Sequence, residues 1–256
     1  MPQSGIGRWG ALAAVASPFV GELTTEHVNN ALVRKIEEQS RTIPHVSDRR
    51  SQELLDRVRS EYDVDVGTMH SPYLVGTGAA YLHPAGIERV AQKFEGADLH
   101  PRAREAIQRR LDQIIDRKGQ HGIILTGRHF KKPGTMEHEL GHAIAMHRGN
   151  PVERFIGDHG LGSGTPSFPT RVLPHIVAIA TGILKGPLAG ASAGAASGIL
   201  AQSPRLYSEY SADKYGDRLL DRSAPYQRSF LPRLTYLTNA ALPAMISGGL
   251  SGILRR

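Results

Sequence analysis

An apolar stretch from Leu173 to Ala201 limits the folds that this chain can adopt. It is rich in Gly and Ala and is interrupted by Lys185-Gly186-Pro187. A single membrane-spanning helix would have to continue through this Gly-Pro break. Each half holds only about 12 to 15 residues, fewer than the roughly 20 that a bilayer requires. We therefore predict a hairpin of two buried helices at 175–201, with a membrane-embedded hairpin as the alternative. A second apolar tract at 240–254 allows the same two interpretations.

Composition limits the classes of protein that the chain can belong to. It has 256 residues, enough for one main domain with embellishments, and a formal net charge of +7 that comes from 24 Arg and 7 Lys against 24 acidic residues. No aromatic-basic module or finger pattern accompanies this charge, so we expect no nucleic-acid partner. The absence of cysteine excludes disulfides, zinc ribbons and thiol catalysis. Any bound metal must be held by His and carboxylate groups.

The first sixty residues are interpreted as an N-terminal helical extension, 1–60. Thr24 and Thr25 are placed to cap a helix that runs from Val28 to Ile36. Ser47 precedes a second helix whose apolar residues are Leu54, Leu55 and Val58. The apolar stretch of residues 9–15 is short for a secretory signal, and a buried helix explains it equally well.

The remainder, 61–256, is predicted to form one main domain of α+β class, mostly α. Short β-prone segments at 64–66, 73–75 and 79–82 are separated by Gly and Pro, which predicts a small sheet. An amphipathic helix is expected from Pro101 to just before Gly119, because its apolar residues recur at helical spacing. The compact apolar segment 122–126 is predicted to be a further strand.

The run His138-Glu139-Leu140-Gly141-His142 carries the strongest chemical signal. We expect it on a helix that Thr135 caps and that ends near Gly149. Residues four apart project from the same side of a helix, so both imidazoles can reach one tetrahedral metal. Glu139 is offset by one position and is suited to act as a general base on a water molecule. From this composition such a pattern is expected by chance only about 0.03 times per chain.

A catalytic zinc site usually has three protein ligands, so the pattern requires another ligand elsewhere. The segment 208–215 is predicted to be helical, which puts Glu209 and Asp213 on one side of the helix at positions i and i+4. Glu209 is the candidate third ligand. Asp213 is the candidate acceptor for the outer nitrogen of a ligand histidine, where it would fix the tautomer of that ring.

These motifs resemble the gluzincin family that includes the HtpX-like, CAAX prenyl protease-like and OMA-type zinc metallopeptidases. The family pattern is HExxH on one helix and Glu-x-x-Ala-Asp on a later one, which correspond here to 138–142 and 209–213. His147 matches a histidine common in the soluble members, and the apolar hairpin matches an insert between the motifs. The chain departs from the family at Arg205 and Leu206, where a Ser-Arg pair is common.

The resemblance implies a zincin-like metallopeptidase domain that binds Zn²⁺. Such a domain would hydrolyse peptide bonds with a metal-activated water, and Glu139 would be the general base. The resemblance also implies a role in protein quality control. It also implies that Ile123, Ile124 and Leu125 form an edge strand against which an extended peptide lies. The transition-state donor is not identified. The following residues are remote candidates for it: His129, His175, Tyr226, Arg228, Arg233 and Tyr236.

The implied partners are a protein or peptide substrate and, at the apolar tracts, a membrane surface. A second class of function stays open, namely a catalytically inactive zinc-bound scaffold or a membrane-surface binding protein. The intact Glu139 argues against a scaffold, because a structural site requires only ligands. The compartment and oligomeric state are not fixed by the sequence, although a cell-envelope or membrane-associated location is favoured over the cytoplasm.

Overall fold

The computed structural model describes residues 18, 20–21, 23–28, 30–31, 48–70, 79–95, 100–127, 134–159, 168–220 and 230–254. The chain divides into two compact units. We call Met1–Arg41, Thr165–Leu206 and Ser229–Arg256 the bundle unit, and Thr42–Gly164 with Tyr207–Arg228 the mixed unit. Each unit is described separately below.

The sheet of the mixed unit contains β1 (Gly67–His70), β2 (Ala79–Leu82) and β3 (Ile123–Thr126). The strand order is β1-β3-β2, with β1 parallel and β2 antiparallel to β3. Strands at 79–82 and 122–126 are thus confirmed, whereas 64–66 precedes β1 and 73–75 lies outside the described residues. The small mixed sheet beside many helices confirms the α+β, mostly α class.

The prediction that Ile123, Ile124 and Leu125 form an edge strand is wrong. Ile123 is paired with Gly67 of β1 on one side and with Leu82 of β2 on the other. Because β3 is paired along both sides, it has no free row of main-chain groups to offer a peptide. Ile123 and Ile124 are moreover fully buried. Among the described strands, β2 is an edge strand that contacts the helix carrying His138.

Helices surround this sheet, and several have the bounds that their apolar spacing predicts. α2 (Asp48–Tyr62) buries Leu54 and Val58 completely, and α4 (Pro101–Arg117) ends just before Gly119 as expected. α3 (Pro84–Glu95) and α6 (Pro151–His159) are additional helices. α2 belongs to the same hydrophobic core as Leu140 and Ile144, so residues 48–60 pack within the mixed unit. The assignment of 61–256 to one metallopeptidase domain stays a prediction.

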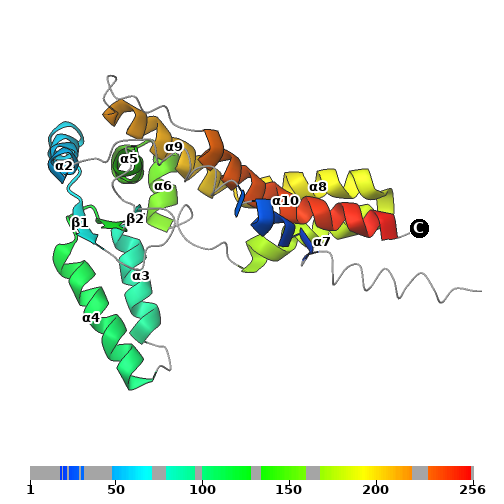
Figure 1. Cartoon of the computed structure of the whole chain (residues 1–256), viewed down its shortest axis with the longest axis horizontal. Coiled ribbons are helices and arrows are strands. Elements are labelled where there is room, and N and C mark those ends of the chain that lie inside the picture. The colour runs from blue at the N-terminus through cyan, green and yellow to red at the C-terminus, as the bar shows by residue number, and fades with distance from the viewer. Residues whose placement is uncertain are drawn as a thin grey trace, which may run out of the picture. The chain divides into compact units, whose positions relative to one another are not determined.

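The bundle unit consists mainly of α7 (Phe168–Lys185), α8 (Pro187–Ala201) and α10 (Phe230–Leu254). Figure 1 shows α10 lying alongside α7 and α8, and all three helices pack against one another. α7 and α8 form the predicted hairpin, which turns at Gly186 with a φ of 97°. The apolar tract 240–254 is the second half of α10.

The prediction that the hairpin helices are buried is wrong for their large side chains. Leu184 and Leu188 are 72% and 82% exposed, and Leu173, Ile176 and Leu200 are exposed as well. The helix contacts are made instead by small residues. The residues buried in α7, α8 and α10 include Ala178, Gly182, Gly190, Gly194, Gly198, Ala240, Ala244, Ser247, Gly248, Ser251 and Gly252. A Cβ at Gly190 or Gly194 would clash with the backbone of α10, so glycine permits this close packing.

The N-terminal part of the bundle unit is helical at the described positions between 18 and 31. Thr24 and Thr25 therefore lie inside a helix, and the prediction that they cap one is wrong. Their hydroxyls donate to the carbonyls of Val20 and Gly21, four residues earlier, at 2.8 and 2.7 Å. The predicted continuation to Ile36 and the apolar stretch 9–15 lie outside the described residues.

In the part of the chain that the structure describes, no helix combines the length and the apolar character that crossing a membrane would require.

Candidate metal centre

The helix α5 (Thr135–Arg148) carries the HELGH run and is one of the most buried helices of the mixed unit. Its N-cap is Gly134 with a φ of 85°, so the prediction that Thr135 caps it is wrong. Glu137 accepts a hydrogen bond from the Gly134 N–H at 2.9 Å, which closes the first turn. The helix ends at Arg148, before Gly149, as predicted. The His138 and His142 rings then lie side by side on one face, with centroids 4.8 Å apart.

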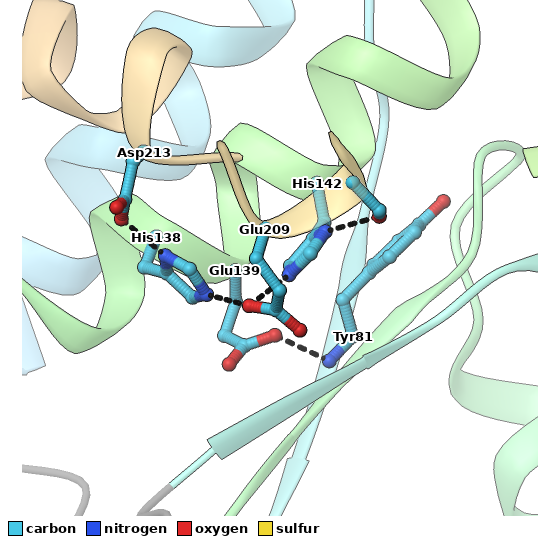
Figure 2. Close-up of polar contacts among 7 residues, drawn as sticks. Tyr81, His138, Glu139, His142, Glu209 and Asp213 are labelled. Atoms are coloured by element: carbon cyan, nitrogen blue, oxygen red, sulfur yellow. Dashed lines mark hydrogen bonds and ion pairs between the residues drawn. The ribbon is translucent and has the colours of Figure 1, made fainter. Parts of the chain in front are cut away.

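The helix α9 (Ser203–Leu219) brings Glu209 to these two histidines (Figure 2). Glu209 Oε2 lies 3.2 Å from His138 Nε2 and 3.6 Å from His142 Nε2. One nitrogen or oxygen from each residue lies within 4.8 Å of the other two, so the three can hold a metal ion. Ligands about 2.05 Å from a tetrahedral zinc are about 3.3 Å apart. The observed distances and the N, N, O donor set therefore fit zinc.

Hydrogen bonds on the far side of each imidazole orient the two histidines. His138 Nδ1 lies 3.0 Å from Asp213 Oδ1, one turn after Glu209 on α9. His142 Nδ1 lies 3.3 Å from Ser208 Oγ. If each Nδ1 carries the proton, it donates to that oxygen and leaves Nε2 free to bind a metal. The predicted placement of Asp213 is thus observed, while Ser208 is an additional partner.

The charges of this cluster are coupled. Burial lowers the pKa of His138, but its hydrogen bonds to Asp213 and Glu209 and the charge of Glu139 outweigh burial and raise the pKa to about 10. Burial raises the pKa of Glu209, but hydrogen bonds from His138 and His142 outweigh this and hold the pKa well below its usual range. Without a metal, a proton on His138 therefore compensates the charge of the carboxylates.

Glu139 lies next to the cluster and is held by the sheet. Its Oε2 accepts a hydrogen bond from the backbone N–H of Tyr81 on β2 at 2.7 Å, and the residue is only 9% exposed (Figure 2). This N–H points away from β3, because it reaches α5. Glu139 is thus fixed beside His138 and Glu209 while it remains outside the group of three that can hold a metal.

The two site helices meet at a glycine. A Cβ at Gly141 would stand 2.8 Å from the carbonyl carbon of Ala212 and 2.9 Å from the backbone nitrogen of Gly216. Ordinary contacts of this kind are about 3.5 to 4 Å long. The absence of a side chain at Gly141 therefore lets α9 approach α5 closely enough for Glu209 to reach both histidines.

His147, near the end of α5, links the same helix to β2 by another route. His147 Nε2 lies 2.9 Å from Tyr81 Oη. Both side chains donate to the carbonyl of His121, at 3.0 Å from His147 Nε2 and at 2.6 Å from Tyr81 Oη. The His147 ring stacks on His83 at 4.8 Å. Burial and the charges of His83 and His121 lower the pKa of His147 to about 4, so it is neutral near pH 7. β2 is thus attached to α5 through both the main chain and the side chain of Tyr81.

The other residues predicted from the sequence are not part of this cluster. Ile123, Ile124 and Leu125 lie in the central strand, as described above. His175 belongs to the bundle unit, where its Nδ1 lies 2.9 Å from Ser247 Oγ. Of the remaining candidates for a transition-state donor, His129, Tyr226 and Arg228 lie outside the described residues. Arg233 and Tyr236 lie in α10, where the structure describes the helix but not their side chains.

Sequence reasoning missed two residues that bind site side chains, namely Tyr81 and Ser208, and the buried carboxylate of Glu153, which contacts α9. Glu153 alone had a detectable signal, because Asn150 three positions earlier forms a capping-box pattern with it. Tyr81 and Ser208 act through contacts with residues 58 and 66 positions away along the chain. No local pattern indicates such contacts.

Comparison of the chain with models of known families, with curated proteins and with solved structures found no match. The geometry of the site and the motifs are therefore the features that indicate a function.

Proposed function

We propose that the chain is a zinc-dependent endopeptidase of the gluzincin type, with His138, His142 and Glu209 as zinc ligands and Glu139 as general base. The observation that carries this proposal is the distance of Glu209 Oε2 from the two imidazoles, 3.2 Å for His138 and 3.6 Å for His142. The two sequence motifs also support it. The zincin-like identity of the fold and a role in protein quality control belong to the same proposal.

Bound zinc would supply Lewis-acid polarisation of a peptide carbonyl and of a water molecule. Glu139 would take a proton from that water as its oxygen bonds to the carbonyl carbon, and would give the proton to the amine as the C–N bond breaks. The Tyr81 N–H holds the Glu139 carboxylate at 2.7 Å, which limits its rotation before a substrate arrives. Asp213 and Ser208 would keep the two ligand imidazoles in the correct tautomer.

An extended peptide would lie along β2 in this proposal, in place of the strand expected from the sequence. β2 pairs with β3 on one side only, and Tyr81 directs its N–H toward the opposite side. Main-chain groups alternate in direction along a strand, so those of Ala79 and the carbonyl of Tyr81 face the side of Glu139, while the Tyr81 N–H is already bound to Glu139. Strand addition at such an edge is a common way to hold a peptide in extended form.

The proposal is tested by a Glu139→Gln variant assayed on an unfolded substrate such as casein. Removing a general base is expected to reduce cleavage by at least about 100-fold. Glutamine has nearly the same shape and can still accept the Tyr81 N–H, so zinc content should stay near one ion per chain. Wild type and variant that both bind zinc and are equally inactive would refute the peptidase and leave the zinc-bound scaffold as the explanation.

A second proposal, in which the bundle unit contacts a membrane surface, is favoured by one observation. Large apolar side chains of α7 and α8 are exposed while small residues occupy the helix contacts, a distribution typical of helices surrounded by lipid. Leu184 and Leu188 flank the hairpin turn, beside Lys185. α7, α8 and α10 contain no Asp or Glu, so their charge suits anionic lipid.

Flotation with liposomes that contain phosphatidylserine tests this second proposal. Wild type should float at low salt, and a Leu184→Ser/Leu188→Ser variant should float much less, because both substitutions remove exposed apolar surface. A wild type that stays in solution, or a double variant that floats as well as wild type, would contradict lipid contact at the hairpin turn.

A further inference from the structure

The buried carboxylate of Glu153 lies outside the metal cluster and has contacts that no step of the proposed reaction uses. It is only 3% exposed and lies in the first turn of α6. Its local role is a capping box with Asn150: Asn150 Oδ1 accepts from the Glu153 N–H at 3.0 Å, and Glu153 Oε2 accepts from the Asn150 N–H at 2.7 Å. A capping box does not require a buried carboxylate, so this role leaves the burial unexplained.

The other contacts of Glu153 are with α9, the helix of the third ligand. Ser211 donates to Oε1 at 2.9 Å and Tyr215 donates to Oε2 at 3.1 Å, while Lys214 Nζ lies 3.8 Å from Oε1. Ser211 is 1% exposed, so no bulk water can replace its partner. Hydrogen bonds to a charged acceptor are stronger than neutral ones, and an unpaired buried hydroxyl is costly.

The geometry of α9 explains why this attachment matters for the metal site. Ser211 and Tyr215 are four residues apart, as are Glu209 and Asp213, and the two pairs are offset by two positions. An offset of two is about 200° on a helix, so the pairs project from opposite sides of α9. One side holds Glu209 and Asp213 against α5, and the other side is held by α6. Only Gly149 and Asn150 separate α5 from α6, so the histidines and Glu153 lie on consecutive helices.

We infer that Glu153 is a positioning residue that fixes α9, and with it Glu209 and Asp213, at the distance from α5 that zinc binding requires. This inference rests on the proposed zinc site. The distances between a metal and its ligands deviate from their ordinary values by only about 0.2 Å. A small displacement of α9 would therefore lower the affinity for zinc. Glu153 acts through Ser211 and Tyr215 and touches neither the metal ligands nor Glu139.

The experiment measures zinc affinity by chelator competition in wild type, Glu153→Ala and Glu153→Gln. We expect Glu153→Ala to raise the Kd for zinc by about 10- to 100-fold, the effect typical of residues that support metal ligands. Glu153→Gln keeps one acceptor oxygen for a hydroxyl of α9 and should fall between the two. Val58→Ala is the matched control, because it destabilises the same core from α2 and the valine side chain has no polar group that could bind α9. Its zinc Kd should stay within about twofold of wild type.

Cobalt(II) substitution supplies a readout that a loss of stability alone would not change. Its visible absorption reports the ligand set, so Glu153→Ala should show a shifted or weakened band while Val58→Ala keeps the wild-type spectrum. If Glu153→Ala does not fold, Glu153→Gln and Tyr215→Phe carry the same comparison. Unchanged Kd and spectra in the Glu153 variants would refute the positioning role while leaving the zinc site intact. A wild type that binds no zinc would instead refute the proposed function, and the inference with it.

Discussion

A methyl group at Gly141 should disrupt the site without touching any ligand. Gly141→Ala would put a Cβ 2.8 Å from the carbonyl carbon of Ala212 and 2.9 Å from the nitrogen of Gly216, both backbone atoms of α9. A flexible side chain could move aside, but a helix backbone cannot. α9 would therefore have to withdraw from α5 by roughly 1 Å to restore ordinary contact distances.

The expected magnitude follows from two opposing effects. Alanine is a better helix former than glycine by about 1 kcal/mol, which stabilises α5. Overpacking costs about 1 to 3 kcal/mol, and a clash with backbone lies at the upper end of that range. We expect a net loss of about 1 to 2 kcal/mol in the free energy of unfolding. A 1 Å withdrawal of Glu209 exceeds the tolerance of a metal site several-fold, so the Kd for zinc should rise by about 100-fold or more.

Urea denaturation of the zinc-free protein and chelator competition for zinc measure these two quantities. Gly86→Ala is the matched control, because a Cβ at that helical glycine meets no atom within 4 Å. It should be neutral or slightly stabilising and should leave zinc binding unchanged. If Gly141→Ala behaves like Gly86→Ala in both assays, the close approach of α9 to α5 does not determine the site.

Three further predictions concern protons and the support of the ligands. The pKa of His138 is raised to about 10 in the metal-free protein, so this imidazole must lose its proton to bind zinc. Calorimetry in two buffers near pH 7 should therefore detect about one proton released per zinc. Binding heats that are independent of the buffer would contradict this. Asp213→Ala should raise the Kd for zinc by about 10- to 100-fold in chelator competition, and an unchanged Kd would show that the hydrogen bond to His138 does not support the ligand. His147, whose pKa falls from 6.5 unfolded to about 4 folded, stabilises the protein above about pH 6.5 and loses that contribution as the pH falls toward 4. Because the ring is partly exposed, we expect wild type to lose about 1 to 2 kcal/mol more than His147→Gln between about pH 7 and pH 4.5 in urea denaturation, and parallel losses would refute this.

The sequence was most informative where one helix supplies the whole pattern. The HELGH run predicts that His138 and His142 share a face, since that relation follows from helical geometry alone. The same reasoning places Glu209 and Asp213 on one side of α9. Their distance from the histidines could not be derived, because it depends on Gly141 and on contacts between segments about 70 residues apart.

Strand order was the clearest limit of prediction. The segments 79–82 and 122–126 have the composition of strands, but nothing within either segment shows which lies at the edge. β3 is paired with a strand on each side, and the side chains of Ile123 and Ile124 are buried on its two opposite faces. Consecutive apolar residues of this kind are typical of a central strand. The family resemblance implies that a peptide lies along residues 123–125, whereas the edge strand beside Glu139 is β2.

The hairpin was predicted correctly as two helices and incorrectly as buried. Gly186 and Pro187 mark the turn because a positive φ and a first-turn proline suit those positions. Burial could not be inferred from hydrophobicity, because the small residues rather than the large ones make the contacts in this bundle. Similarly, Thr24 and Thr25 resemble caps in sequence, yet their hydroxyls bond to carbonyls four residues earlier within a helix.

Anomalous diffraction at the zinc edge, from crystals of the zinc-loaded protein, tests the proposed zinc centre most directly. We expect a single strong zinc peak about 2 Å from His138 Nε2, His142 Nε2 and one carboxylate oxygen of Glu209, with Glu139 nearby but not a ligand. A zinc ion bound elsewhere, or bound by the two histidines without Glu209, would contradict the proposed centre.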